Sequence, residues 1–160
     1  EMGGSHFLKV IQGRKAGRPP RLDFAPELAL QNALRDLVRA GHIRSAHDCS
    51  EGGLAVALAE ACFNPAGQLG AEIDLGGAGE MRLDQLLFNE SQSRVVISIV
   101  PGSAAEVMQV LKERGVSGHR LGVIGGEALT IAAGGEILRW PIAEIYDDWF
   151  NSIGALLREP

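Results

Sequence analysis

Residues 43–63 read IRSAHDCSEGGLAVALAEACF, and this stretch decides the fold. A short strand over Ile43–Ala46 leads through paired glycines into a helix that runs from Leu54 to about Phe63. Apolar residues lie almost all round this helix, so we expect it in the interior of the protein. The stretch therefore favours a domain that combines strands with helices.

The remaining chain alternates amphipathic helices with strands. Apolar residues at three-and-four spacing predict further helical segments: from Asp23 to Gly41, 83–87, 104–111 and 142–156. Further strands are predicted over 71–75, 95–100 and 121–124, and the paired glycines Gly134 and Gly135 predict a hairpin between 129–132 and 136–140. The unbroken apolar run 95–100 is typical of a central strand with both faces covered. We expect an α+β fold (an α/β sandwich): a mixed β-sheet flanked by helices.

The first 22 residues differ in composition from the rest of the chain. The chain opens with Glu1-Met2-Gly3-Gly4-Ser5, which we interpret as a start in mid-fold after a missing domain. Residues 12–21 are basic and contain two glycines and two prolines, and they indicate a solvated hinge. A phosphate-binding strip is the alternative there. We expect residues 1–22 to be a linker from the preceding domain and residues 23–160 to be one α/β domain.

Composition excludes several classes of protein. The formal net charge of −5 argues against a general nucleic-acid binder, because such proteins need positive charge over one face. No apolar run approaches the roughly 20 residues that span a bilayer, and no signal peptide is recognisable. Cys49 and Cys62 lack metal-ligand spacing and are interpreted as buried free thiols. We expect a cytoplasmic protein with no membrane partner and no nucleic-acid partner.

The first candidate site is the turn from His47 to Gly53. A helix N-terminus presents unpaired N–H groups, and Gly52 and Gly53 would let a phosphate approach them closely. Asp48 could hold a magnesium ion that bridges such phosphates, because Mg²⁺ favours one or two carboxylates and keeps its waters. The alternative needs no ligand: Asp48 as the N-cap and Glu51 three residues later would form a capping box.

The second candidate site is the polar run that precedes the most apolar strand. It reads Glu90-Ser91-Gln92-Ser93-Arg94. Glutamate and glutamine there could bind hydroxyls or amides, and Arg94 could pair with a phosphate or carboxylate. A loop that merely happens to be polar is the alternative. The histidines His6, His42 and His119 are isolated in sequence and are interpreted as surface or structural residues.

Taken together, two motifs resemble one enzyme family. They are residues 46–60, AHDCSEGGLAVALAE, and residues 87–94, LFNESQSR. In this order they look like phosphoribosylformylglycinamidine synthase, and specifically the C-terminal domain of its large synthetase subunit. The opening Gly3-Gly4-Ser5 and the run Gly17-Arg18-Pro19-Pro20 also fit the approach to that domain. Cys49 stands where a small aliphatic residue is expected, and a cysteine packs as one.

The resemblance implies a function and its partners. Such a synthase is an ATP-dependent C–N ligase of purine biosynthesis that converts formylglycinamide ribonucleotide and ammonia to the amidine, releasing ADP and phosphate. It uses Mg²⁺ and ATP, and its partners would be the preceding domains of the subunit, a glutaminase subunit that supplies ammonia and a small accessory subunit. The implied fold is that of the C-terminal domain of aminoimidazole ribonucleotide synthetase.

Residue roles also follow from the resemblance. By motif, Asp48 matches a magnesium ligand, and the residues that match the ribonucleotide-binding run are Glu90, Ser91 and Gln92. The family's large subunit carries two copies of this unit, and the chain matches the second copy. Its pocket would serve the substrate, an auxiliary nucleotide or no ligand, and the catalytic histidine would lie in a domain absent from this chain. The isolated chain is therefore expected to be inactive. A related selenophosphate synthetase or kinase is the remaining alternative.

Overall fold

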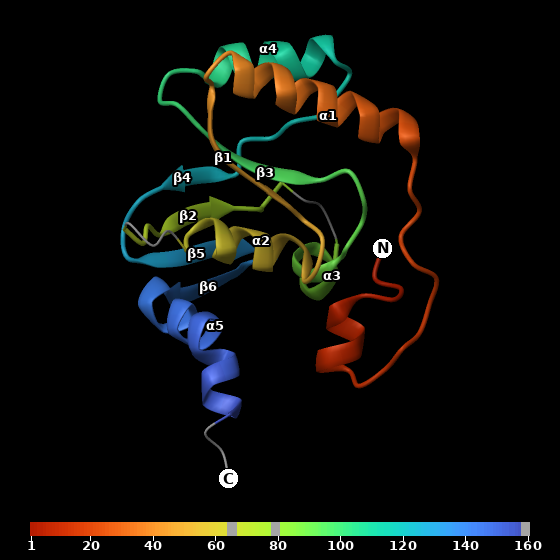
Figure 1. The fold of residues 1–160 in the computed structure, drawn as a ribbon, viewed down its shortest axis with the longest axis vertical. Coiled ribbons are helices and arrows are strands. Elements are labelled where there is room, and N and C mark those ends of the chain that lie inside the picture. Colours follow the sequence, from red (N-terminus) through yellow and green to blue (C-terminus); the bar gives the residue numbers. More distant parts are fainter. Residues whose placement is uncertain (64–66, 78–80, 158–160) are drawn as a thin grey trace. The chain divides into compact units, whose positions relative to one another are not determined.

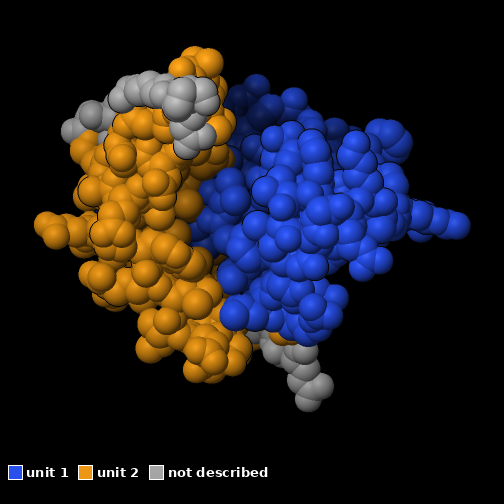
Figure 2. Space-filling model, turned by 90° about the horizontal axis from the view of Figure 1, so that it is seen from below, with its two compact units in different colours: residues 1–58, 82–120 blue, residues 59–81, 121–160 orange. Residues whose placement is uncertain are grey.

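The computed structural model describes residues 1–63, 67–77 and 81–157 and divides the chain into two compact units (Figure 2). Unit 1 comprises residues 1–58 and 82–120, and unit 2 comprises residues 59–81 and 121–160.

Unit 1 packs two helices on a two-stranded sheet (Figure 1). Helices α1 (Phe24–Arg39) and α4 (Ala104–Glu113) lie side by side over strands β1 (Ile43–Asp48) and β3 (Val95–Ile99), which pair antiparallel. Apolar residues of both helices form the core between them, and residues of both strands pack against it: Ala33, Leu37, Val107, Leu111, Ile43, Ile97 and Ile99. The predicted helical segments are thus confirmed here.

The prediction of a central strand at 95–100 is wrong. Within the described residues β3 pairs with β1 alone, and all five of its residues are half-buried rather than buried. The run is nevertheless apolar because Ile97 and Ile99 of β3 pack against the core formed by α1 and α4. Covering helices thus account for the apolar residues, and a second neighbouring strand is not required.

The glycine turn and the polar run both belong to unit 1. Helix α2 (Gly53–Ala61) follows the turn, and its side chains Leu54, Ala57 and Leu58 are buried, as its apolar sequence predicted. A short helix, α3 (Leu83–Phe88), precedes the polar run.

The first 22 residues make specific contacts within unit 1. They contain a short π-helix, η1 (Phe7–Ile11), whose Phe7 ring stacks on Phe88 with the centroids 5.1 Å apart. The Gly4 N–H donates to the Ala16 carbonyl at 2.9 Å. This segment folds back on itself, and its connection to a preceding domain stays a prediction.

Unit 2 contains the expected mixed sheet, in the order β4-β2-β5-β6 (Figure 1). The four strands are β2 (Ala71–Asp74), β4 (Gly122–Ile124), β5 (Ala128–Ala133) and β6 (Glu136–Pro141). Strands β2 and β5 are parallel, and the other pairs are antiparallel. Gly134 and Gly135, with φ of 60° and 82°, form the predicted hairpin turn between β5 and β6. The α+β fold with a mixed sheet is therefore confirmed.

Helix α5 (Ile142–Leu156) follows β6 directly and runs away from the end of that strand (Figure 1). It lies where the sequence predicts an amphipathic helix, and Ile142 at its start is buried. The two cysteines are buried free thiols as predicted, and burial raises the pKa of both Cys49 and Cys62. Among the described residues, no helix is both long enough and apolar enough to cross a membrane.

Candidate functional site

The two sequence motifs meet in unit 1, where the polar loop after α3 contacts the glycine turn before α2. Gly53 lies against the backbone of the loop: a Cβ at this position would sit 2.5 Å from the Asn89 carbonyl oxygen and 2.9 Å from that of Leu87. At Gly52 a Cβ would lie 2.3 Å from Cγ2 of Val56. Both glycines also have positive φ, at +79° and +68°. Packing and backbone conformation thus account for both glycines without a ligand.

The capping-box prediction for Asp48 and Glu51 is wrong. Asp48 is the last residue of β1, whereas α2 begins only at Gly53. Four residues lie between Asp48 and the first helical residue, so its carboxylate cannot act as the N-cap. The reason is that Gly52 has a positive φ of 79°, so the residues after Asp48 form a turn rather than the first turn of a helix.

Glu90 joins the two motifs. Its Oε1 atom accepts hydrogen bonds from the Gly52 N–H at 2.9 Å and the His6 N–H at 2.8 Å, and it lies 3.6 Å from Nδ1 of His6. The Glu90 side chain is only 14% exposed. Hydrogen bonds from backbone N–H groups to a carboxylate are stronger than neutral ones. A negative charge of the protein therefore already occupies part of the turn where a phosphate was expected.

The second glycine N–H is also engaged. The Gly53 N–H donates to the Ser50 carbonyl at 3.1 Å. Both backbone donors that the sequence offered to a phosphate thus have partners within the chain, and phosphate binding by Gly52 and Gly53 stays a prediction that requires one of them to exchange its partner.

Arg94 stabilises the loop rather than extending from it. Its Nη2 donates to the Asn89 carbonyl at 2.6 Å, and its Nε donates to the Ser91 carbonyl at 3.3 Å. The Arg94 carbonyl in turn accepts from the Cys49 N–H at 2.9 Å, next to the glycine turn. The guanidinium therefore fixes the shape of the loop through its own backbone.

Ser93 has an unusual conformation that the sequence did not reveal. It is the one residue other than glycine with positive φ, at 60°, in the part of the chain that the structure describes. Its hydroxyl donates to Oε2 of Glu27 on α1 at 2.6 Å. This bond, with a second from Gln31, holds the pKa of Glu27 below its usual value. No sequence signal marks this contact, because 66 residues separate the partners.

The other predicted residues are more open to solvent. Gln92 is exposed, and its Nε2 lies 3.4 Å from the Glu90 carbonyl. Ser91 is half-buried, and its hydroxyl lies 2.6 Å from the backbone nitrogen of Glu1. Gln92 thus presents an amide to solvent at the surface of the loop.

Asp48 is exposed and ionises readily. A hydrogen bond from the Ser50 side chain is the largest of the causes that lower its pKa, followed by one from its own backbone. The described residues hold no group of three or more His, Cys, Asp or Glu side chains placed to share a metal ion. A single exposed carboxylate still fits Mg²⁺ of the kind that is held chiefly by phosphates and water.

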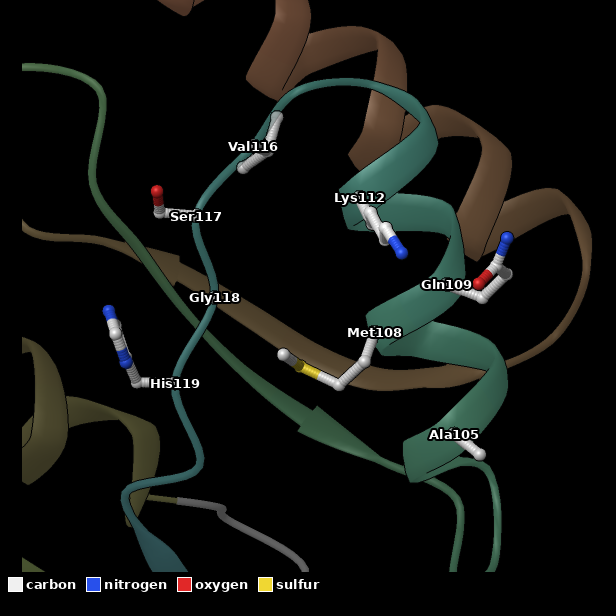
Figure 3. Close-up of a pocket in the computed structure, with 8 residues that line it drawn as sticks. All are labelled: Ala105, Met108, Gln109, Lys112, Val116, Ser117, Gly118 and His119. Atoms are coloured by element: carbon white, nitrogen blue, oxygen red, sulfur yellow. The ribbon is translucent and has the colours of Figure 1, made fainter.

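A groove elsewhere in unit 1 contains none of these residues. It has a volume of about 480 Å³ and lies between α4 and residues 116–119. Figure 3 shows Met108 and Lys112 on the side of α4 that faces this loop, while the His119 ring points away from them. Its polar groups do not converge, so the groove is not the candidate site.

These features define an α+β domain in which one largely buried carboxylate, that of Glu90, joins a glycine turn to a polar loop. The family described as AIR synthase related protein, C-terminal domain, matches residues 1–133, so the chain belongs to this family.

Curated relatives extend the similarity over nearly the whole chain. The phosphoribosylformylglycinamidine synthase subunit PurL of Moorella thermoacetica is 42% identical over 98% of the chain. PurL of an Anaeromyxobacter species is 43% identical over 99%. The chain spans 21% of the length of each of these relatives.

Solved structures show the same fold. T. maritima PurL complexed with ATP has a TM-score of 0.70 at 19% identity, over 91% of this chain and 24% of that one. T. maritima PurL complexed with FGAR has a TM-score of 0.66 at 21% identity, over 75% of this chain and 21% of that one.

Proposed function

We propose that this chain is the C-terminal domain of the large subunit of a phosphoribosylformylglycinamidine synthase. The observation that carries the proposal is the 42% identity to a PurL subunit over 98% of the chain, which includes both motifs. The complete protein would convert formylglycinamide ribonucleotide, ATP and ammonia to formylglycinamidine ribonucleotide, ADP and phosphate in the cytoplasm. A glutaminase subunit and a small accessory subunit would be its partners, and a T. maritima structure named PurLQS supports such an assembly.

Within that protein, we propose that Glu90 and Arg94 brace the domain. Glu90 accepts from two backbone N–H groups, and Arg94 donates to two backbone carbonyls. Because these charged groups already form hydrogen bonds within the chain, a ligand at the same atoms would have to compete with them. The motif then serves to hold the glycine turn against the loop.

A second role is supported by the exposed residues of the same motifs. Asp48 and Gln92 face solvent, and Ser91 is half-exposed. In this role Asp48 would hold Mg²⁺ on a nucleotide whose phosphates lie at Gly52 and Gly53. The ribonucleotide would then be bound by the polar loop: Glu90, Ser91, Gln92 and Arg94. When bound, Mg²⁺ would supply positive charge against the charge that develops on the phosphates.

Calorimetric titration of the complete polypeptide separates the two roles. Magnesium-ADP and formylglycinamide ribonucleotide would be titrated into the wild type, Glu90→Gln, Asp48→Ala and, as an exposed control on α4, Glu106→Gln. The bracing role predicts that Glu90→Gln lowers the thermal unfolding temperature but changes the ribonucleotide Kd less than two-fold.

A ten-fold weaker ribonucleotide Kd in Glu90→Gln, without a change in unfolding temperature, would instead support substrate binding, since ten-fold corresponds to about 1.4 kcal/mol. Loss of ADP binding in Asp48→Ala alone would support the metal role. In a separate activity assay, the complete protein would be given ATP and ammonia with and without formylglycinamide ribonucleotide. ADP formation at the same rate without the ribonucleotide would contradict the proposed synthase activity.

A further inference from the structure

Helix α5 lies beyond the part of the chain that matches the domain family. The family match ends at residue 133, whereas α5 spans Ile142–Leu156. The PurL relative nevertheless covers 98% of the chain, which leaves only about three of 160 residues unmatched. The helix is therefore included in the match to relatives that are about five times as long as this chain, whereas the match to the family model ends before it.

One side of α5 is strongly apolar and exposed. At about 100° per residue, its large apolar residues fall in a stripe about 140° wide. Five of them are between 51% and 81% exposed, and we call them the α5 stripe: Trp149, Phe150, Ile153, Leu156 and the adjoining Leu157. Soluble proteins rarely leave so many neighbouring apolar side chains in water unless a partner covers them.

The α5 stripe is held in place by contacts within unit 2. The Trp149 ring packs on Phe63 with the centroids 5.3 Å apart, and its Nε1 donates to Oε1 of Glu60 at 3.1 Å. The Phe150 ring stacks on Tyr146 at 5.5 Å. The middle of the helix is thus fixed, and the exposed residues Ile153 and Leu156 continue the stripe along the same helix. A preformed apolar surface loses little conformational entropy on docking.

Charge on α5 has a single sign. Between Ile142 and Leu156 the helix carries Glu144, Asp147 and Asp148 and no Lys, Arg or His. Asp148 lies about 100° from Trp149 around the helix axis, at one flank of the stripe. A surface that covers the stripe would therefore be apolar at its centre, with a basic residue opposite this flank.

We infer that the α5 stripe docks on the part of the same polypeptide that lies outside these 160 residues. The surface that it contacts there would be apolar, with a basic residue opposite Asp148. The inference rests on the proposed function, because that proposal makes this chain about one fifth of a longer subunit. The long relatives match α5, and about four fifths of their length lies outside the matched part, which favours the remainder of the subunit as the occupant over a second copy of the domain.

Photo-cross-linking in the complete polypeptide tests the inference. A p-benzoylphenylalanine residue would replace Ile153 in the stripe and, as the matched control, Asn151 on the opposite face of α5. After irradiation, mass spectrometry identifies the cross-linked peptides. The Ile153 probe is expected to give intramolecular cross-links to residues outside this chain, near a Lys or Arg, and the Asn151 probe at least ten-fold fewer.

Other cross-linking results would overturn the inference. These are cross-links from Ile153 to a second copy, to another subunit or to residues 1–157, and also no cross-links at all.

Hydrogen exchange provides an independent measurement: Ile153→Asp or Phe150→Ser should speed amide exchange in residues 149–157 at least ten-fold, and Asn151→Asp should not. Equal exchange in all variants would refute docking. Expected cross-links in a protein without synthase activity would support docking and reject the proposed function alone.

Discussion

Gly53→Ala is the substitution whose cost the structure defines most closely. Gly53 has φ of +68°, and its missing Cβ would lie 2.5 Å from the Asn89 carbonyl oxygen. Gly115 has the same φ of +68°, lies in the same unit and has no atom within 4 Å of its missing Cβ. The two glycines therefore share the backbone penalty and differ in the space around the new methyl group.

The expected magnitudes follow from these two terms. A left-handed conformation costs an L-residue about 1–2 kcal/mol, so Gly115→Ala should lower the free energy of unfolding by about that amount. Overpacking adds about 1–3 kcal/mol, so Gly53→Ala should cost about 2–5 kcal/mol. Urea unfolding measures both variants, and at a slope of about 2 kcal/mol/M each 2 kcal/mol moves the midpoint by about 1 M.

Equal losses of stability in the two variants would refute the reasoning. That result would mean that the loop gives way to the methyl group without cost, and that the contact between the glycine turn and the Asn89 carbonyl is not a tight one. A larger loss at Gly115 would show that the backbone penalty depends on context more than the shared φ implies.

Two further predictions concern the polar loop. Arg94→Lys should lower the free energy of unfolding by about 1–3 kcal/mol, because an ammonium cannot reproduce the two hydrogen bonds of the guanidinium to backbone carbonyls; a urea midpoint equal to that of the wild type would contradict this. Ser93→Ala should raise the pKa of Glu27 toward its usual value, as measured by NMR titration. Because the folded-state pKa is lowered, this contact stabilises the protein above the unfolded pKa of about 4.3 and is lost as pH falls through the folded pKa. The stability difference between wild type and Ser93→Ala should therefore shrink in acid, and a constant difference would contradict the assignment.

Local patterns predicted the elements of the fold well. The sequence of α1 has apolar residues at helical spacing and is followed by the glycine Gly41, and the hairpin is marked by Gly134 and Gly135. The pairing of β3 was not predictable in this way, because an apolar strand needs a cover but does not specify whether a helix or another strand supplies it.

The candidate site shows a similar limit. The sequence placed polar residues in two loops, but it could not show that Glu90 accepts from Gly52, since 38 residues separate them. Nor could it show that Arg94 would donate to its own loop, because an arginine beside a strand has the same pattern whether it binds a ligand or a backbone carbonyl. Side-chain partners depend on tertiary contacts that local spacing does not encode.

The hydrogen bond between Glu90 and Gly52 gives a physical reason for the two motifs to occur together. A glycine turn before a helix attracts an anion, and in this domain the anion is a carboxylate of the protein. A phosphate at the same N–H would meet the negative charge of Glu90 and would have to displace it. A nucleotide that binds here without disturbing Glu90 must therefore approach through the exposed side of the turn, where Asp48 could meet it through a metal ion. Glu90 and Asp48 thus differ in their surroundings: Glu90 is bonded to backbone N–H groups inside the fold, and Asp48 is exposed at its surface.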